Sequence, residues 1–185
     1  MRLGFRTILL GFVILMALFL VLSILLPSIE PESTTPGNLT TARVTRVVDG
    51  DTLKVRLPGQ DDEQTIRIIG VDTPETKDPN REVMCYGAEA TAKTEDLTDR
   101  VQGQIELEKD ISETDRYGRL LRYVWLPNSD GRTMLNEELV KGGYVRAVVF
   151  PPDVKYRDRS STEEARAKQQ HLGLWGACPS FGAPT

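Results

Sequence analysis

The sequence predicts an α+β fold, a small β-barrel with helices packed on it, preceded by one N-terminal transmembrane helix. The order of segments predicts the barrel, because three β-rich segments are followed by a helical segment, two further β-rich segments and two further helical segments. An Asp-Gly pair, typical of a hairpin turn, separates the first two β-rich segments. A continuous apolar run near the N-terminus predicts the transmembrane helix.

The composition limits the chemistry that the chain can perform. Its 185 residues allow one domain of ordinary size with an appendage, and the formal net charge is -4. A single histidine, His171, argues against mechanisms that need two histidines and against His-rich zinc sites. Two cysteines are too few for a four-cysteine zinc site or an iron–sulfur cluster. Carboxylates and arginines therefore have to carry any catalysis.

The apolar run over residues 8–26 is long enough to cross a membrane. As a helix it would be about 28 Å long, close to the ~30 Å hydrocarbon core of a bilayer. Arg2 and Arg6 precede it, so the positive-inside rule places residues 1–7 in the cytoplasm as a short stub and the rest of the chain outside. We expect an uncleaved signal anchor. The alternative is a cleaved signal peptide, which would release the domain by secretion.

The segment after this run predicts where the folded domain begins. Residues 27–40 are rich in Pro, Ser and Thr, which predicts an extended, solvated linker. We expect one folded domain over residues 41–178 and a short tail over residues 179–185.

Five strands are expected within the domain. They are Arg43–Val48, Asp51–Leu57, Gln64–Val71, Gln104–Lys109 and Arg119–Leu126. The first two flank Asp49-Gly50, where glycine would supply the positive φ of a type I′ hairpin turn.

Three helices are expected, over Gly87–Arg100, Thr133–Lys141 and Ser161–Leu172. The pair Gly142-Gly143 predicts the end of the second helix. Ser161 predicts an N-cap for the third, because acidic residues follow it in the first turn.

Charged residues are concentrated at the ends of the predicted strands. Asp51 follows the hairpin turn, and Asp72 and Glu75 follow the third strand in the segment Val71–Thr76. Carboxylates together with a backbone carbonyl, left free beside Pro74, form an oxygen-only ligand set that suits Ca2+. Guanidinium groups at Arg67 and Arg119 suit phosphate. Taken singly, each fragment is equally typical of an ordinary turn or of a solvated strand residue.

Taken together, the motifs and their order point to one family. They are Val48–Thr52 (VDGDT), Arg67–Thr76 (RIIGVDTPET), Tyr86–Ala90, Asp115–Arg119 (DRYGR), Leu135–Gly143 and Gly173–Trp175. In this sequence and spacing they resemble the staphylococcal nuclease family over about residues 41–176. The resemblance implies an OB-type five-stranded β-barrel with three helices. It also implies a monomeric, Ca2+-dependent endonuclease that cleaves DNA and RNA with low sequence specificity.

The resemblance also implies roles for individual residues. Asp51 and Asp72 would be side-chain ligands of Ca2+, and Thr73 would contribute its backbone carbonyl. Glu75 would orient or deprotonate the attacking water.

The substrate would contact a second set of residues. Arg67 and Arg119 would hold the scissile phosphate, while Tyr117 and the neighbouring Arg116 would contact a nucleotide phosphate. Because these residues are all present, we expect an enzyme; the alternative is a non-catalytic OB-fold module that binds nucleic acid.

Two features depart from the family pattern. The family has tyrosines after the fifth strand, whereas this chain has Ala147–Pro152, so Phe150 or Tyr156 would have to stack on a base. The net charge of -4 is unusual for a nucleic-acid-binding protein. Binding would therefore rely on a local positive cleft and on the metal.

The two cysteines form a candidate disulfide. Outside the cytoplasm, an even number of cysteines favours the bridge Cys85–Cys178, and the alternative is two free thiols. Neither cysteine is close in sequence to the proposed Ca2+ ligands. The bridge is therefore expected to stabilise the domain without affecting its activity.

Overall fold

The computed structural model describes residues 36–75 and 84–181. The apolar run over residues 8–26 lies outside these ranges, so the predicted membrane anchor remains a prediction. Within the described ranges, no helix is both long enough and apolar enough to cross a bilayer.

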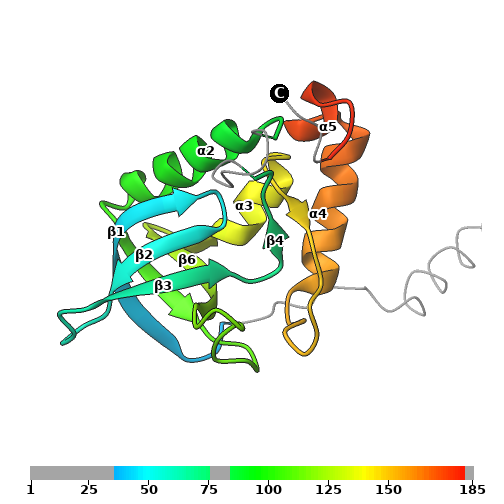
Figure 1. Cartoon of the computed structure of the whole chain (residues 1–185). Helices are drawn as coiled ribbons and strands as arrows, with labels where there is room; N and C mark the ends of the chain where they lie inside the picture. The colour runs from blue at the N-terminus through cyan, green and yellow to red at the C-terminus, as the bar shows by residue number, and fades with distance from the viewer. Residues whose placement is uncertain (1–35, 76–83, 182–185) are drawn as a thin grey trace, which may run out of the picture. The chain divides into compact units, whose positions relative to one another are not determined.

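Five strands form a closed barrel (Figure 1). They are β1 (Leu39–Asp49), β2 (Thr52–Arg56), β3 (Glu63–Ile68), β5 (Gln104–Glu108) and β6 (Leu120–Asn128). Neighbours in the order β3-β2-β1-β5-β6 are antiparallel, and a parallel pairing between β3 and β6 closes the barrel. The five-stranded barrel expected for this family is therefore confirmed.

The long strand β1 joins the two halves of the barrel. Its first part, Leu39–Arg43, pairs with β5, and the part from Arg43 onward pairs with β2. Register irregularities between Val44 and Arg46 and between Val47 and Asp49 allow the strand to bend from one partner to the other. The strand begins two residues before the expected start of the domain at Thr41.

Three short strands were not expected. Gly70 has a φ of 76° and interrupts the predicted third strand, so Val71–Asp72 forms a separate strand, β4. It pairs with β8 (Arg146–Ala147). Strand β7 (Gly131–Met134) forms a hairpin with β6, so the prediction that a helix begins at Thr133 was wrong.

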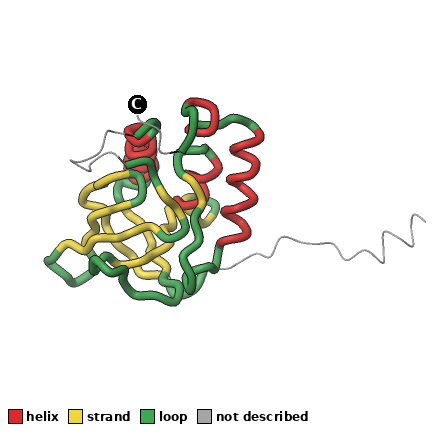
Figure 2. The backbone as a smooth tube through the Cα atoms, turned by 45° about the vertical axis from the view of Figure 1, so that its right-hand side comes forward, coloured by secondary structure: helices red, strands yellow, loops and turns green. Residues whose placement is uncertain are grey.

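The helices lie at one end and along one side of the barrel (Figures 1 and 2). They are α2 (Gly87–Arg100), α3 (Leu135–Lys141), α4 (Arg157–Gln169) and the short α5 (Leu174–Ala177). Helix α2 has the predicted bounds, and α3 ends as predicted before Gly142-Gly143. Ser161 is not an N-cap, because α4 begins four residues earlier, after the buried Tyr156. The anchoring of Tyr156 in the core thus overrides the local capping signal.

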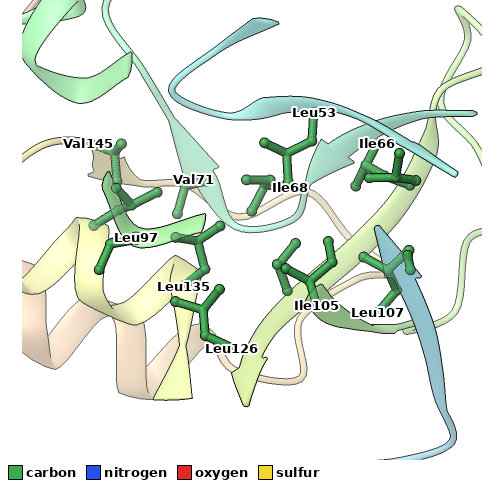
Figure 3. Packing of buried hydrophobic residues seen from close by; sticks show 14 of the residues in the cluster. Leu53, Ile66, Ile68, Val71, Leu97, Ile105, Leu107, Leu126, Leu135 and Val145 are labelled. Carbon is green, nitrogen blue, oxygen red and sulfur yellow. The ribbon is translucent and has the colours of Figure 1, made fainter. Parts of the chain in front are cut away.

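One hydrophobic core fills the barrel and extends under α2 and α3 (Figure 3). Leu53, Ile66, Ile68 and Val71 point into it from strands β2 to β4, and Leu135 from α3. Each such side chain contributes about 1.5–3 kcal/mol when fully buried. These buried residues are close in sequence to Asp51, Arg67 and Asp72, so their packing fixes the backbone that carries the three charged side chains.

Candidate active site

The turn between β1 and β2 positions Asp51. The Asp51 N–H donates to Asp49 Oδ1 at 3.1 Å, and Thr94 Oγ1 on α2 donates to the Gly50 carbonyl at 2.9 Å. Gly50 is not in the left-handed region, so the type I′ explanation was wrong. Glycine is needed there because a Cβ would lie 2.5 Å from Thr73 Cγ2 and 3.1 Å from Ala90 Cβ. The turn is therefore packed directly against the segment that follows β4.

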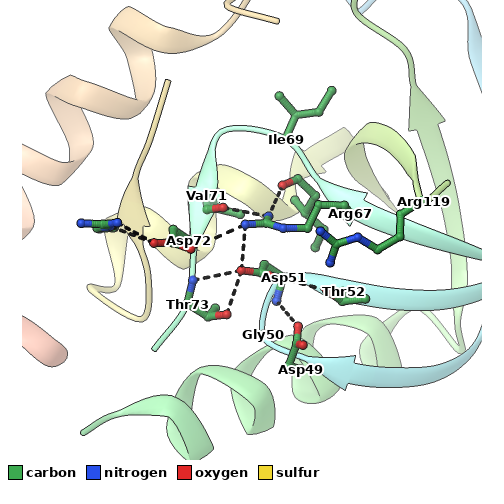
Figure 4. Close-up of polar contacts among 12 residues, drawn as sticks. Asp49, Gly50, Asp51, Thr52, Arg67, Ile69, Val71, Asp72, Thr73 and Arg119 are labelled. Atoms are coloured by element: carbon green, nitrogen blue, oxygen red, sulfur yellow. Dashed lines mark hydrogen bonds and ion pairs between the residues drawn. The ribbon is translucent and has the colours of Figure 1, made fainter. Parts of the chain in front are cut away.

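The Asp51 carboxylate binds that segment (Figure 4). Its Oδ2 accepts hydrogen bonds from the Thr73 N–H at 3.0 Å and from Thr73 Oγ1 at 2.8 Å. Its Oδ1 accepts from Thr52 Oγ1 at 3.0 Å. Asp51 is buried, with 6% of its surface exposed. The structure thus brings Asp51 and Thr73 together across 22 positions of sequence.

The Arg67 guanidinium lies between two carboxylates. Its Nη2 is 3.2 Å from Asp51 Oδ2 and 3.7 Å from Asp72 Oδ1. Its Nη1 donates to the carbonyls of Ile68 and Val71, at 2.6 Å and 2.8 Å. Both carboxylates therefore lie against the same guanidinium group (Figure 4).

Asp72 has a second partner that sequence analysis missed. Arg146 on β8 binds Asp72 Oδ2 through Nε at 2.9 Å and Nη2 at 2.7 Å. The two residues face each other in the β4–β8 register. Their separation of 74 positions, through two-residue strands, leaves no local sequence signal.

The carboxylates exceed the positive charge that the fold supplies at this turn. Burial, followed by repulsion from the Asp51 charge, raises the pKa of Asp49 to about 6. Carboxylate oxygens gathered near one turn suit a divalent cation such as Ca2+; Asp51 is buried, whereas Asp49 and Asp72 are partly exposed. In residues 36–75 and 84–181, no group of three or more His, Cys, Asp or Glu side chains forms a complete metal site. Water and substrate would therefore have to supply further ligands.

A cleft of about 390 Å³ lies beside Arg67. Arg119, Arg116, Tyr117 and Phe150 also line it. The structure therefore brings together the two predicted phosphate-binding arginines and the predicted substrate-contacting pair.

The turn over residues 115–119 orients Arg119, which lines the cleft together with Arg67. Asp115 Oδ2 accepts from Arg119 Nε at 2.7 Å, and Asp115 Oδ1 accepts from the Arg119 N–H at 3.0 Å. Arg116 and Arg119 lie 4.7 Å and 5.6 Å from the centre of the Tyr117 ring. Tyr117 as a whole is 68% exposed and accessible to a ligand.

The structure separates the two aromatic residues considered for stacking. Phe150 lines the cleft and is 67% exposed. Tyr156 is buried in the core and donates to Glu108 Oε2 at 2.9 Å. Tyr156 is thus excluded from a stacking role because its ring and its hydroxyl are both committed to the fold.

Glu75 is held through its backbone. Its N–H donates to Met84 Sδ at 3.2 Å, and its carbonyl accepts from the Met84 N–H at 2.9 Å. It lies three residues beyond Asp72 and is half-buried.

Comparison with known proteins decides the family. A family model described as staphylococcal nuclease homologue matches residues 65–177, which include Arg67, Asp72, Glu75 and Arg119. The chain belongs to the staphylococcal nuclease family. The resemblance drawn from its motifs is thereby confirmed.

Several curated members of the staphylococcal nuclease family are similar over most of the chain. The thermonuclease of Staphylococcus hyicus is 40% identical over 171 residues, covering 89% of this chain and 95% of the relative. The thermonuclease of Staphylococcus intermedius is 42% identical over 133 residues, covering 71% and 74%. Endonuclease YncB of Bacillus subtilis is 39% identical over 146 residues, covering 78% and 66%.

Proposed function

We propose that the chain is a Ca2+-dependent endonuclease that hydrolyses phosphodiester bonds of DNA and RNA with low sequence specificity. Its thermonuclease and endonuclease relatives support a nuclease activity. The single observation that carries the mechanism is geometric: Arg67 and Arg119 line one cleft, and two carboxylates converge on Arg67 at its edge.

The cleft is suited to a nucleic-acid strand. Guanidinium groups bind phosphate oxygens in a bidentate manner and stay charged at any working pH. Arg67, Arg116 and Arg119 bring three guanidinium groups to one cleft, which Asp115 and Asp153 also line. Phe150 presents an exposed side chain on which a base can stack without sequence preference, and Tyr117 is exposed where it can contact a nucleotide phosphate.

Asp51, Asp72 and the Thr73 carbonyl would hold Ca2+. The ion would supply positive charge that stabilises the phosphate and orients water. Because Thr73 donates two hydrogen bonds to Asp51, that carboxylate is already fixed in place.

The remaining roles fall to four side chains. Glu75 accepts a proton from the attacking water at its carboxylate, so that no histidine is needed. Arg67 and Arg119 stabilise the charge that develops on the phosphate oxygens. Asp115 orients Arg119 through two hydrogen bonds.

Residues 8–26 would anchor this monomeric nuclease in a membrane, with residues 1–7 in the cytoplasm and the catalytic domain outside. The apolar length and the preceding Arg2 and Arg6 support this arrangement. A disulfide between Cys85 and Cys178 suits an oxidising compartment. Full-length protein should fractionate with membranes, whereas a free mature chain in the medium would indicate a cleaved signal peptide.

The function is tested by digesting DNA and RNA with full-length protein. We expect cleavage with Ca2+, none in excess chelator, and a loss of about 10²–10³-fold in Glu75→Gln. Glu63→Gln, an exposed glutamate at the start of β3, is the matched control and should cleave normally. Equal cleavage in chelator would refute the metal assignment. Binding without cleavage would indicate the non-catalytic OB-fold module instead.

A further inference from the structure

The turn that precedes α2 links Glu75 to the disulfide. Met84 binds both backbone groups of Glu75, at 2.9 Å and 3.2 Å. The next residue, Cys85, is bonded to Cys178, with a Cα–Cα distance of 5.9 Å. Two adjacent residues thus connect the proposed base to the C-terminal segment.

The same turn is conformationally strained. Tyr86 has a φ of 71°, in the left-handed region, which costs a non-glycine residue about 1 kcal/mol or more. Its ring packs at 5.8 Å from the ring of Tyr144. The Gly87 N–H donates to the Met84 carbonyl at 3.1 Å and closes the turn. The conformation persists because its surroundings hold it.

The far end of the bridge is firmly anchored. The Cys178 N–H donates to the Leu174 carbonyl at 3.1 Å, and the Leu174 N–H donates to the Gly143 carbonyl at 2.8 Å. Leu174 is buried, with 2% of its surface exposed. The bridge therefore ties the Met84–Gly87 turn to a packed element rather than to a loose tail.

We propose that Met84 and the Cys85–Cys178 disulfide are positioning residues for Glu75. Without the bridge, the strain at Tyr86 is free to relax, and Met84 moves with it and displaces the Glu75 backbone from its observed position. A displacement of about 1 Å at a catalytic group can cost about 10²-fold in rate. The inference rests on the proposed role of Glu75, and it replaces the expectation that the bridge affects stability alone.

The test uses full-length protein with both cysteines replaced, Cys85→Ser/Cys178→Ser. We measure kcat and KM at a temperature at which circular dichroism shows the wild type and the variant folded. We expect kcat to fall by about tenfold, within the range that a small displacement produces. KM should change little, because Arg67 and Arg119 are untouched. Met84→Leu, which removes the sulfur acceptor, should also lower kcat, whereas Met134→Leu, at a buried methionine of β7, should not.

The decisive comparison repeats the cysteine replacement in a Glu75→Gln background. If the bridge acts through Glu75, the loss of the bridge should not lower kcat further in the Glu75→Gln background, because effects of residues that act as a unit are not additive. An unchanged kcat in the cysteine variant, or an equal fall in both backgrounds, would overturn the inference. Failure of the proposed function is distinguishable, because then the wild type would not cleave, or Glu75→Gln would cleave as fast as the wild type.

Discussion

Arg67 and Arg119 are held in the cleft in different ways. The Arg67 guanidinium binds two backbone carbonyls and lies against two carboxylates, with 15% of its side chain exposed. Arg119 binds the carboxylate of Asp115, and 30% of its side chain is exposed. Arg67 therefore has a structural role in addition to its proposed catalytic one, whereas Arg119 is available mainly for the substrate.

This difference predicts how the two alanine variants behave. Arg119→Ala should lower kcat/KM by about 10²–10³-fold and change the free energy of unfolding by less than about 1 kcal/mol. Arg67→Ala should lower kcat/KM similarly and also destabilise the Ca2+-free protein by about 2 kcal/mol, because buried Asp51 loses its counter-charge. Phosphodiester cleavage and urea unfolding measure both quantities. Arg100→Ala, on the exposed face of α2, is the control. Equal stability of both variants would contradict the account.

Motifs predicted most of these residues, but not their partners. Contiguous motifs in the sequence indicated four of the site residues, namely Asp51, Arg67, Asp72 and Arg119. Arg146 contacts Asp72 from 74 positions away, and Met84 contacts the Glu75 backbone from nine positions away, so no local periodic pattern indicated either contact.

At the scale of elements, long-range contacts set the boundaries of strands and helices that local sequence signals did not predict. The Asp-Gly pair correctly predicted the β1–β2 hairpin, although packing against Thr73 and Ala90, rather than positive φ, requires the glycine. The start of α4 was misplaced because Tyr156 is anchored to Glu108. Strands β4 and β8 have only two residues each, too few for a periodic pattern.

Glu108 illustrates how elements are joined by a buried charge. Its side chain is 0% exposed and binds Lys155. It also accepts from the Gly37 N–H at 2.7 Å, Trp125 Nε1 at 2.8 Å and Tyr156 Oη at 2.9 Å. Burial alone would raise the pKa of Glu108, but the hydrogen bonds outweigh it and lower the pKa below the usual 4.5. One carboxylate thus connects β5, β6, the start of the domain and the segment before α4.

This lowered pKa predicts a pH dependence of stability. A carboxylate with a depressed pKa stabilises the fold above its unfolded-state pKa, and this contribution is lost as pH falls through the lower folded-state value. Unfolding free energy should therefore decline below about pH 4.5 in the wild type, with a smaller slope in Glu108→Gln. At pH 7 that variant should be less stable by about 3 kcal/mol, because Lys155 loses its buried partner. Urea titrations measure the unfolding free energy of both proteins at each pH. The same pH dependence in the wild type and in Glu108→Gln would contradict the lowered pKa of Glu108.

At the scale of the whole molecule, the disulfide closes the chain across 93 positions of sequence. In the chain-entropy model, a loop of this size contributes about 4–5 kcal/mol to stability. Both ends lie at one side of the barrel, where α2 begins and α5 ends. The sequence predicted the pair from compartment and cysteine number, but only the fold showed that Cys85 is next to the residue that binds Glu75.

Reduction of the bridge should lower the thermal midpoint of the protein by several degrees or more. Calorimetry of protein with and without reductant measures the change, and Cys85→Ser/Cys178→Ser should be insensitive to reductant. Two free thiols in non-reduced protein from an oxidising compartment would show that the bridge does not form.

The most direct test of the account is a Ca2+ titration of DNA cleavage, because it joins the proposed ligands to the reaction. In Asp51→Asn and Asp72→Asn, half-maximal cleavage should require about tenfold or more Ca2+ than in the wild type, since each replacement removes one charged oxygen ligand. Asp61→Asn, exposed in the turn between β2 and β3, is the matched control and should follow the wild-type curve. Superimposable titrations for all four proteins, or cleavage that needs no Ca2+, would contradict a calcium-dependent nuclease centred on these residues.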